Sequence, residues 1–355
     1  IPALLGFYRQ HRHEDSLVLA TIIATEGSTY RKPGAMMLIS RGGRFEGMIS
    51  GGCLEGDLLQ HANGLFEQGG ARHISYDMHA GDDLVWNLGL GCDGVIHLLL
   101  QRLDKEDGFG FLEQLDRAQS GRQAGLLALV TQSSTRLQPG KLGFLDAGGG
   151  LVGGGELDSL LRESTMTWPD WRYRAEQLRM DDAGCEVLLV NMPAQTRVLV
   201  CGGGPDAVPV ARALGSLDWD VRIVDHRPAF AKQERFPAGC RVHQARPGQL
   251  SGVLDLGEVD AAVIMSHHLE NDADYLRELA AFDIPYLGVL GPAARRSKLS
   301  EMAACTEARL YGPVGLDIGA ELPQAIALSV AAEIHAVLNG RDGRSLTLRA
   351  PAGSE

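Results

Sequence analysis

Two cysteines lie in glycine-rich stretches where a thiol could carry out chemistry. Cys53 follows Gly51 and Gly52 in the run MISGGCLEGD, and a helical pattern of apolar residues begins directly after it. The positive end of a helix dipole lowers the pKa of a thiol, and glycine neighbours leave its sulfur accessible. Such a thiol can bind a soft metal or carry persulfide sulfur, so Cys53 is a candidate ligand.

The second thiol, Cys92, lies in the run NLGLGCDG, which contains too much glycine for a packed helix or strand. The two cysteines could meet in space, which the sequence does not decide. For each of them the alternative is a small, buried apolar side chain. Glu55 and Asp57, which follow Cys53, also read as ordinary acids in the first turn of a helix.

A second glycine-rich loop follows the apolar run VLVC and reads GGGPDA. This G-x-G-x-x-A pattern, with an acid at the end of the next strand, is typical of dinucleotide-binding Rossmann domains. The candidate nucleotide-binding residues are Gly202, Gly204, Ala207 and Asp225. Two residues argue against a bound dinucleotide: Asp206 places a negative charge where a phosphate would lie, and Pro209 interrupts the first helical turn. A Rossmann domain that holds no dinucleotide is therefore the alternative.

Three further positions are candidates for anion binding. Arg31 and Lys32 precede Pro33 and form either a phosphate clamp or a solvated hairpin tip. Arg295 and Arg296 follow a strand and a Gly-Pro turn, where two guanidinium groups and helix amides could converge on an anion. The third is His267, after the strand AAVIM, at the edge of a parallel sheet where ligands bind.

Composition narrows the class of protein. The chain has 355 residues, of which 45% are hydrophobic and 22% charged, so it can form cores in more than one domain. The net charge of −12 argues against nucleic-acid binding, which needs clustered Lys and Arg. No apolar run approaches the roughly 18 residues of a membrane helix. Six scattered cysteines fit a reducing compartment, so we expect a cytoplasmic protein. The chain begins at Ile1, which leaves open a removed leader.

Residues 1–192 are expected to form a mixed α/β domain. Apolar runs predict several strands, and the glycine-rich runs 148–150 and 153–155 read as a hairpin turn. The predicted strands are 16–24, 35–40, 45–49, 95–103, 126–131, 142–146 and 186–191. One helix is predicted after Cys53, with Leu58 and Ala62 on its apolar face, and another over 109–120.

Residues 193–340 are expected to form a second, Rossmann-like domain, followed by a tail at 341–355. Short apolar strands alternate here with helical stretches, which indicates a doubly wound parallel sheet. The predicted strands are 198–201, 221–225, 261–265, 286–290 and 309–311. A last helix is predicted from Pro323, which suits a first turn, to Leu338, just before Gly340.

These motifs together resemble the XdhC/CoxI family over nearly the whole chain. In the first domain the resemblance rests on TEGSTYRKPG (25–34), ISGGCLEGD (49–57) and DLVWNLGLGCDG (83–94). In the second it rests on the loop 202–207, VDHRP (224–228), MSHHLE (265–270), LGP (290–292) and GLDIGAE (315–321). Asp93 departs from the pattern, where Asn is more usual, and its charge would oppose thiolate formation at Cys92.

The resemblance implies a maturation factor for molybdenum hydroxylases such as xanthine dehydrogenase. Members of this family are associated with binding molybdenum cofactor (molybdopterin), protecting it while a cysteine desulfurase partner sulfurates it, and delivering it to the client enzyme. By resemblance, Cys53 is the first candidate ligand of molybdenum and Cys92 the second, and Arg31, Lys32 and Glu55 are candidates for holding the pterin. The implied protein is a cofactor carrier rather than a turnover enzyme, and a homodimer is expected.

Two other functions remain open from the residues. One is an NAD(P)-dependent oxidoreductase with redox thiols, in which Asp225 would favour NAD over NADP. The other is a scaffold that binds the hydroxylase and a sulfurtransferase without touching cofactor. Bound molybdenum, NADH binding and co-purification with the hydroxylase distinguish the three.

Overall fold

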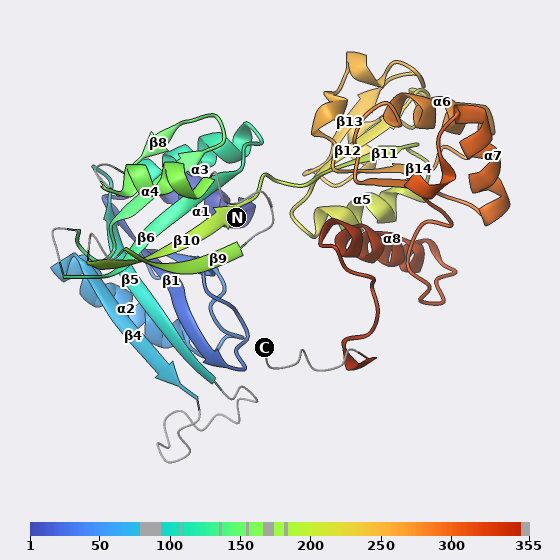
Figure 1. The fold of residues 1–355 in the computed structure, drawn as a ribbon. Coiled ribbons are helices and arrows are strands. Elements are labelled where there is room, and N and C mark those ends of the chain that lie inside the picture. The colour runs from blue at the N-terminus through green and yellow to red at the C-terminus, as the bar shows by residue number, and fades with distance from the viewer. Residues whose placement is uncertain are drawn as a thin grey trace. The chain divides into compact units, whose positions relative to one another are not determined.

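The computed structural model of the protein divides into two compact units, Ile1–Ala194 and Gln195–Glu355 (Figure 1). The structure describes residues 1–78, 94–106, 108–134, 137–153, 156–165, 174–180 and 184–348.

The first unit contains two five-stranded antiparallel sheets. One sheet has the order β3-β2-β1-β5-β4, and its strands are β1 (Ser16–Gly27), β2 (Met36–Ser40), β3 (Phe45–Gly47), β4 (Ala71–Asp77) and β5 (Gly94–Asp104). The other has the order β8-β7-β6-β10-β9, and its strands are β6 (Gly125–Ser133), β7 (Leu142–Asp146), β8 (Leu151–Val152), β9 (Arg174–Met180) and β10 (Cys185–Met192). The helices are α1 (Pro2–His11), α2 (Glu55–Gln68), α3 (Gly110–Ser120) and α4 (Glu156–Thr165).

Both faces of each sheet are buried, because side chains alternate between two cores. Leu17 and Leu19 of β1 lie in a central core that also holds residues of β6, α1 and α3. Val18, Ala20 and Ile22 point the other way, into a core covered by α2. Strands that are apolar on both faces read as continuous apolar runs, which is why the sequence predicts β1 and β6 so clearly.

The second unit has one six-stranded parallel sheet in the order β13-β12-β11-β14-β15-β16. Its strands are β11 (Arg197–Cys201), β12 (Asp220–Asp225), β13 (Arg241–Gln244), β14 (Ala261–Ile264), β15 (Tyr286–Val289) and β16 (Leu310–Tyr311). The helices α5 (Ala207–Gly215) and α8 (Pro323–Leu338) cover one face, and α6 (Leu269–Leu279) and α7 (Ala293–Ala303) cover the other (Figure 1). This is the predicted doubly wound fold, and its strand order reverses between β11 and β14.

Several elements were not predicted from the sequence. They are α1, α4, β4, β8, β9 and β13, and β8 (Leu151–Val152) lies between the two glycine runs that were read as one hairpin turn. β4 is an edge strand with mostly exposed or half-exposed residues, and β13 is a four-residue edge strand whose only apolar side chain is Val242. Neither carries the apolar run that reveals a buried strand.

Candidate functional site

Two connections that carry predicted site residues lie where strands of the first sheet end. We call this end of the strands the edge of the sheet. β1 ends at Gly27 and β2 begins at Met36, so the connection containing Arg31 and Lys32 lies at this edge. β3 also ends here, because Gly47 pairs with Met37 of β2. The connection from β3 to α2, which contains Cys53, therefore starts beside the first one. β5 enters the sheet at the same edge, since Gly94 pairs with Gly27.

The Cys53 loop, defined here as residues 48–54, is organised around the side chain of Ser50. The Ser50 Oγ accepts hydrogen bonds from the backbone amides of residues 52, 53 and 54 at 3.3, 3.1 and 3.0 Å. These amides precede α2 and would otherwise lack helical partners. Ile49 and Leu54 anchor the two ends of the loop in the core beneath α2. Cys53 itself is partly exposed.

Glu55 is buried at the start of α2 and holds the loop from the other side. Its carboxylate accepts bonds from the amides of Ile49 and Ser50, at 3.3 and 2.9 Å, and from Ser50 Oγ at 2.5 Å. Burial alone would raise the pKa of Glu55, but the bonds from Ser50 and Ile49 outweigh it and the pKa lies below its ordinary value. Glu55 was a candidate for holding a pterin. In the structure both of its oxygens are engaged within the loop.

The neighbouring residues of the predicted cofactor set differ in accessibility. Arg31 and Lys32 are exposed, and Thr29 Oγ1 donates a 2.9 Å bond to the Arg31 carbonyl. Asp57 lies in the first turn of α2 and accepts a 2.5 Å bond from the Tyr76 hydroxyl of β4. Cys92 lies outside the described residues.

The predicted nucleotide loop of the second unit has the tight turn and the close helix packing that the sequence predicts, and it lies beside an acid. Gly202 has φ +119°, and a Cβ there would meet the carbonyl oxygen of Met265 at 2.6 Å, so the turn requires glycine. Ala207 is fully buried against the sheet, as predicted for close helix packing. A Cβ added at Gly204 would lie 2.6 Å from a carboxylate oxygen of Asp206.

Asp225, predicted to accept bonds from a ribose, lies at the end of β12 with only 1% of its surface exposed. One oxygen accepts from the Gly203 amide at 2.8 Å and from Arg227 Nη2 at 2.7 Å, and the other accepts from the amide and Nε of Arg227. Burial opposes ionisation, but the bonds from Arg227 and Gly203 outweigh it and hold the pKa of Asp225 below its ordinary value.

The predicted anion-binding residues of the second unit are each paired with a carboxylate. His267, in a left-handed conformation with φ +63°, places Nε2 2.7 Å from Asp206 Oδ2, across the point where the strand order reverses. Arg295 donates to the buried Asp272 at 2.7 Å. Arg296 turns away to Glu307 and to the carbonyl of Gly312. The two guanidinium groups therefore do not converge on a common anion.

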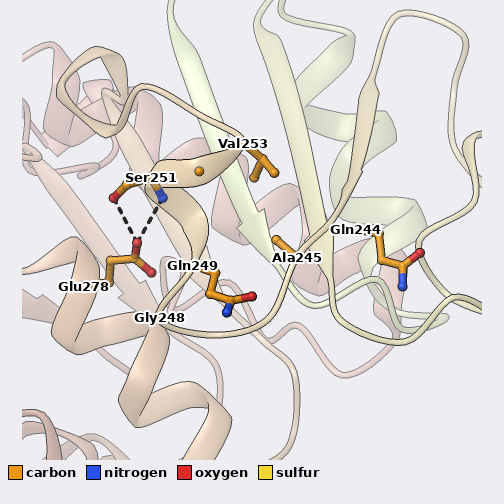
Figure 2. Close-up of a pocket in the computed structure, with 8 residues that line it drawn as sticks. Gln244, Ala245, Gly248, Gln249, Ser251, Val253 and Glu278 are labelled. Atoms are coloured by element: carbon orange, nitrogen blue, oxygen red, sulfur yellow. Dashed lines mark hydrogen bonds between the residues drawn. The ribbon is translucent and has the colours of Figure 1, made fainter.

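A depression in the second unit lies at none of these residues (Figure 2). It has a volume of about 530 Å³ and is lined by Gln244, Ala245, Gly248, Gln249, Ser251, Gly252, Val253 and Glu278. Glu278 of α6 accepts bonds from the amide and hydroxyl of Ser251, both at 2.9 Å. Its carboxylate thus supports the turn that forms the wall rather than facing a ligand.

Two further kinds of feature are missing from the part of the chain that the structure describes. No cluster of three or more His, Cys, Asp or Glu side chains could hold a metal ion there. No helix in these residues is long and apolar enough to cross a membrane.

Comparisons with known proteins identify the family. A profile described as the XdhC and CoxI family matches residues 11–77, and one described as the XdhC Rossmann domain matches residues 198–334. A Bacillus subtilis protein, named as a probable subunit of xanthine dehydrogenase, is 33% identical over 90% of this chain and 93% of its own length. The chain belongs to the XdhC and CoxI family. The Escherichia coli protein named "Molybdenum cofactor insertion chaperone PaoD" is 24% identical over 90% of this chain and 83% of its own length.

A solved structure supports the fold of this family member. A crystal structure from Bacillus halodurans, described as that of a xanthine dehydrogenase, superposes with a TM-score of 0.78 at 26% identity. It covers 96% of this chain and 97% of its own. The predicted fold class, a mixed α/β domain followed by a Rossmann-like parallel sheet, is confirmed.

Two relationships in these sites were not found by sequence reasoning. The Ser50–Glu55 pair resembles a capping box, but its residues are five positions apart rather than three, so the sequence pattern did not reveal it. Asp206 and His267 are 61 positions apart and meet only because β11 and β14 are neighbours in the sheet.

Proposed function

We propose that this protein binds molybdenum cofactor and assists its insertion into a xanthine dehydrogenase-type hydroxylase. The observation that carries the proposal is membership of the XdhC and CoxI family over nearly the whole chain, with relatives named for xanthine dehydrogenase and for molybdenum cofactor insertion. We propose a cofactor carrier, because the site offers a metal ligand, Cys53, and the positive charges of Arg31 and Lys32.

The residues at the edge of the first sheet fit such a cofactor. Cys53 offers a partly exposed sulfur, and thiolates are good ligands for soft metals. Arg31 and Lys32 are exposed at the same edge and carry the charge that a pterin phosphate requires. Gly51 and Gly52 leave the approach to the sulfur without side chains. Glu55 supports the loop and is not assigned to the pterin. Cys92 remains a second proposed ligand on sequence grounds alone.

The proposal includes partners. A molybdenum hydroxylase would be the client, and a cysteine desulfurase would supply sulfur to the bound cofactor. We place the protein in the cytoplasm, because six cysteines without paired spacing fit a reducing compartment. A homodimer is also proposed, and sedimentation velocity of the purified chain measures it directly.

The NAD(P)-dependent alternative is not favoured by the geometry of the second unit. A ribose would need the carboxylate of Asp225, whose two oxygens already accept four hydrogen bonds from Gly203 and Arg227. A phosphate above the glycine loop would also meet the carboxylate of Asp206.

The test is purification after co-expression with cofactor biosynthesis, followed by assays of bound molybdenum and pterin. We expect both to co-purify with the wild-type chain, and Cys53→Ala to lower them by at least about tenfold. Cys185→Ala is the matched control, because it removes a buried thiol of the same unit. Wild-type loading in Cys53→Ala would remove the assignment of Cys53, and absence of molybdenum and pterin from the wild-type chain would remove the proposed function.

A further inference from the structure

The two sheets of the first unit have the same topology. In chain order the elements are α1-β1-β2-β3-α2-β4-β5 and then α3-β6-β7-β8-α4-β9-β10. In each sheet the strands lie in the order third, second, first, fifth, fourth. We call residues 2–104 the first copy and residues 110–192 the second copy.

The hydrogen bonds of the first hairpin are the same in both copies. In the first, the Ile22 amide donates to the Ala35 carbonyl and the Gly34 amide donates to the Ile22 carbonyl. In the second, the Val130 amide donates to the Lys141 carbonyl, and the Gly140 amide donates to the Val130 carbonyl. Both glycines follow a proline and have positive φ. One residue further along the strand, both copies interrupt the pairing with their last strand.

The next turn also agrees. In the first copy, the Ser40 amide donates to the Arg44 carbonyl and the Gly43 amide donates to the Ser40 carbonyl. In the second copy, the Asp146 amide donates to the Gly150 carbonyl and the Gly149 amide donates to the Asp146 carbonyl.

The cores repeat in the same way. Leu19 and its counterpart Leu127 lie in the central core that the copies share. Ala20 and Ala128 lie in the outer cores under α2 and α4. The two copies agree in strand order, in the hydrogen bonds of their turns, in where the strand pairing is interrupted, and in which core each equivalent residue joins. A duplicated unit is expected to show this agreement.

The copies differ where the third strand joins the following helix. In the first copy this connection is the Cys53 loop, 48–54, and in the second it is residues 153–155 only. Counted from the equivalent paired residues Glu46 and Val152, the first connection is longer by five residues. The four residues between the two buried anchors Ile49 and Leu54 are Ser50, Gly51, Gly52 and Cys53, which account for all but one residue of that difference.

We infer that the amino-terminal unit is a duplication of one seven-element repeat, and that Ser50–Cys53 is an insertion in the first copy that serves ligand binding rather than folding. The second copy joins the same two elements without such a segment. The inserted residues rely on their own hydroxyl and on Glu55 for hydrogen bonds, not on the sheet. The ligand they would hold is a soft, thiophilic metal centre, and this part rests on the proposed function.

The test deletes Ser50–Cys53, which brings the first connection to within one residue of the second and keeps Ile49 and Leu54. We expect the deletion variant to fold cooperatively, with a wild-type circular dichroism spectrum and a melting midpoint no lower than that of Glu55→Gln, because both variants lose the bonds between Glu55 and Ser50. Molybdenum and pterin that co-purify with the wild-type chain are expected to fall at least about tenfold in the variant. The full chain is used in every measurement.

A second variant is needed because shortening the connection before α2 could strain the backbone and prevent folding for that reason alone. Ser50→Gly combined with Cys53→Gly keeps the length and removes the side chains of the insertion. Folding of either variant supports the inference about folding, and failure of both to fold cooperatively overturns it. A folded variant that retains wild-type cofactor overturns the assigned role. If the wild-type chain holds no molybdenum or pterin, the proposed function fails, while the folding result still decides whether the segment is a dispensable insertion.

Discussion

The hydroxyl of Ser50 donates a 2.5 Å hydrogen bond to Glu55 Oε2 while its oxygen accepts from three backbone amides. The Ser50 amide donates to the other oxygen of the same carboxylate at 2.9 Å. One buried acid thus fixes the backbone on which Cys53 is mounted. Because charge-assisted bonds to buried groups are strong, this pair is the main determinant of the shape of the Cys53 loop.

The first prediction concerns the pH dependence of this pair. The folded-state pKa of Glu55 is depressed, so its stabilisation is fully present above the unfolded pKa of about 4.3 and is lost as pH falls through the folded pKa. We expect Glu55→Gln to lower the free energy of unfolding by about 1.5–3 kcal/mol at pH 7, with a smaller difference from wild type at pH 3.

Urea unfolding at a series of pH values measures this effect. Glu67→Gln is the control, because Glu67 is an exposed acid on the same helix, and it should change the free energy of unfolding by less than about 0.5 kcal/mol. A gap between wild type and Glu55→Gln that is the same at every pH would contradict the assignment.

The second prediction concerns Asp225. Replacing it with Asn removes the charge that Arg227 and the Gly203 amide share, and should cost about 2–3 kcal/mol of stability at pH 7. Asp283→Asn, which alters a carboxylate of the same unit outside this cluster, should have little effect. In a fluorescence titration, NADH should show no micromolar binding to the wild-type chain. Micromolar binding that is lost in Asp225→Ala would revive the oxidoreductase alternative.

The sequence predicts this fold where its signals are local. The helix from Pro323 to Leu338 has the predicted bounds, because proline in the first turn and glycine just after the end are local signals of where a helix starts and stops. The strand β1 was found from its apolar run, although it continues three residues further, to Gly27. β4 was missed because it is a polar edge strand, and its place is set by pairing with β5 rather than by its own composition.

The same distinction applies to the candidate site. The glycines around Cys53 and the family motifs indicate an accessible thiol from sequence alone. The engagement of Glu55 by Ser50 depends on the conformation of the loop between them. The pairing of Asp206 with His267 depends on which strands are neighbours in the sheet. The positions of these residues along the sequence therefore do not show that their side chains meet.

The third prediction concerns thiol accessibility. Cys53 is partly exposed, whereas Cys185, Cys201, Cys240 and Cys305 are buried. Burial also raises the pKa of Cys201, with a further contribution from Asp272. We expect iodoacetamide to label Cys53 in the native protein at least about 100-fold faster than these four, which react only after local opening that costs a few kcal/mol. Peptide mass spectrometry over time measures each site. Labelling of Cys201 as fast as Cys53 would show that the described burial is wrong.

The fourth prediction compares two glycines at the two ends of α5. Gly202 precedes the helix with φ +119°, and an added Cβ would lie 2.6 Å from the Met265 carbonyl oxygen, so neither the conformation nor the space admits a side chain. Gly202→Ala should therefore destabilise the protein by about 2 kcal/mol or more, with or without any nucleotide. Gly215, at the other end of the helix, has no atom within 4 Å of such a Cβ, and Gly215→Ala should leave the free energy of unfolding unchanged or raise it slightly. Urea unfolding of both variants gives the comparison. Equal stability of the two would mean that the close approach of Gly202 to the Met265 carbonyl is not what requires glycine at this position.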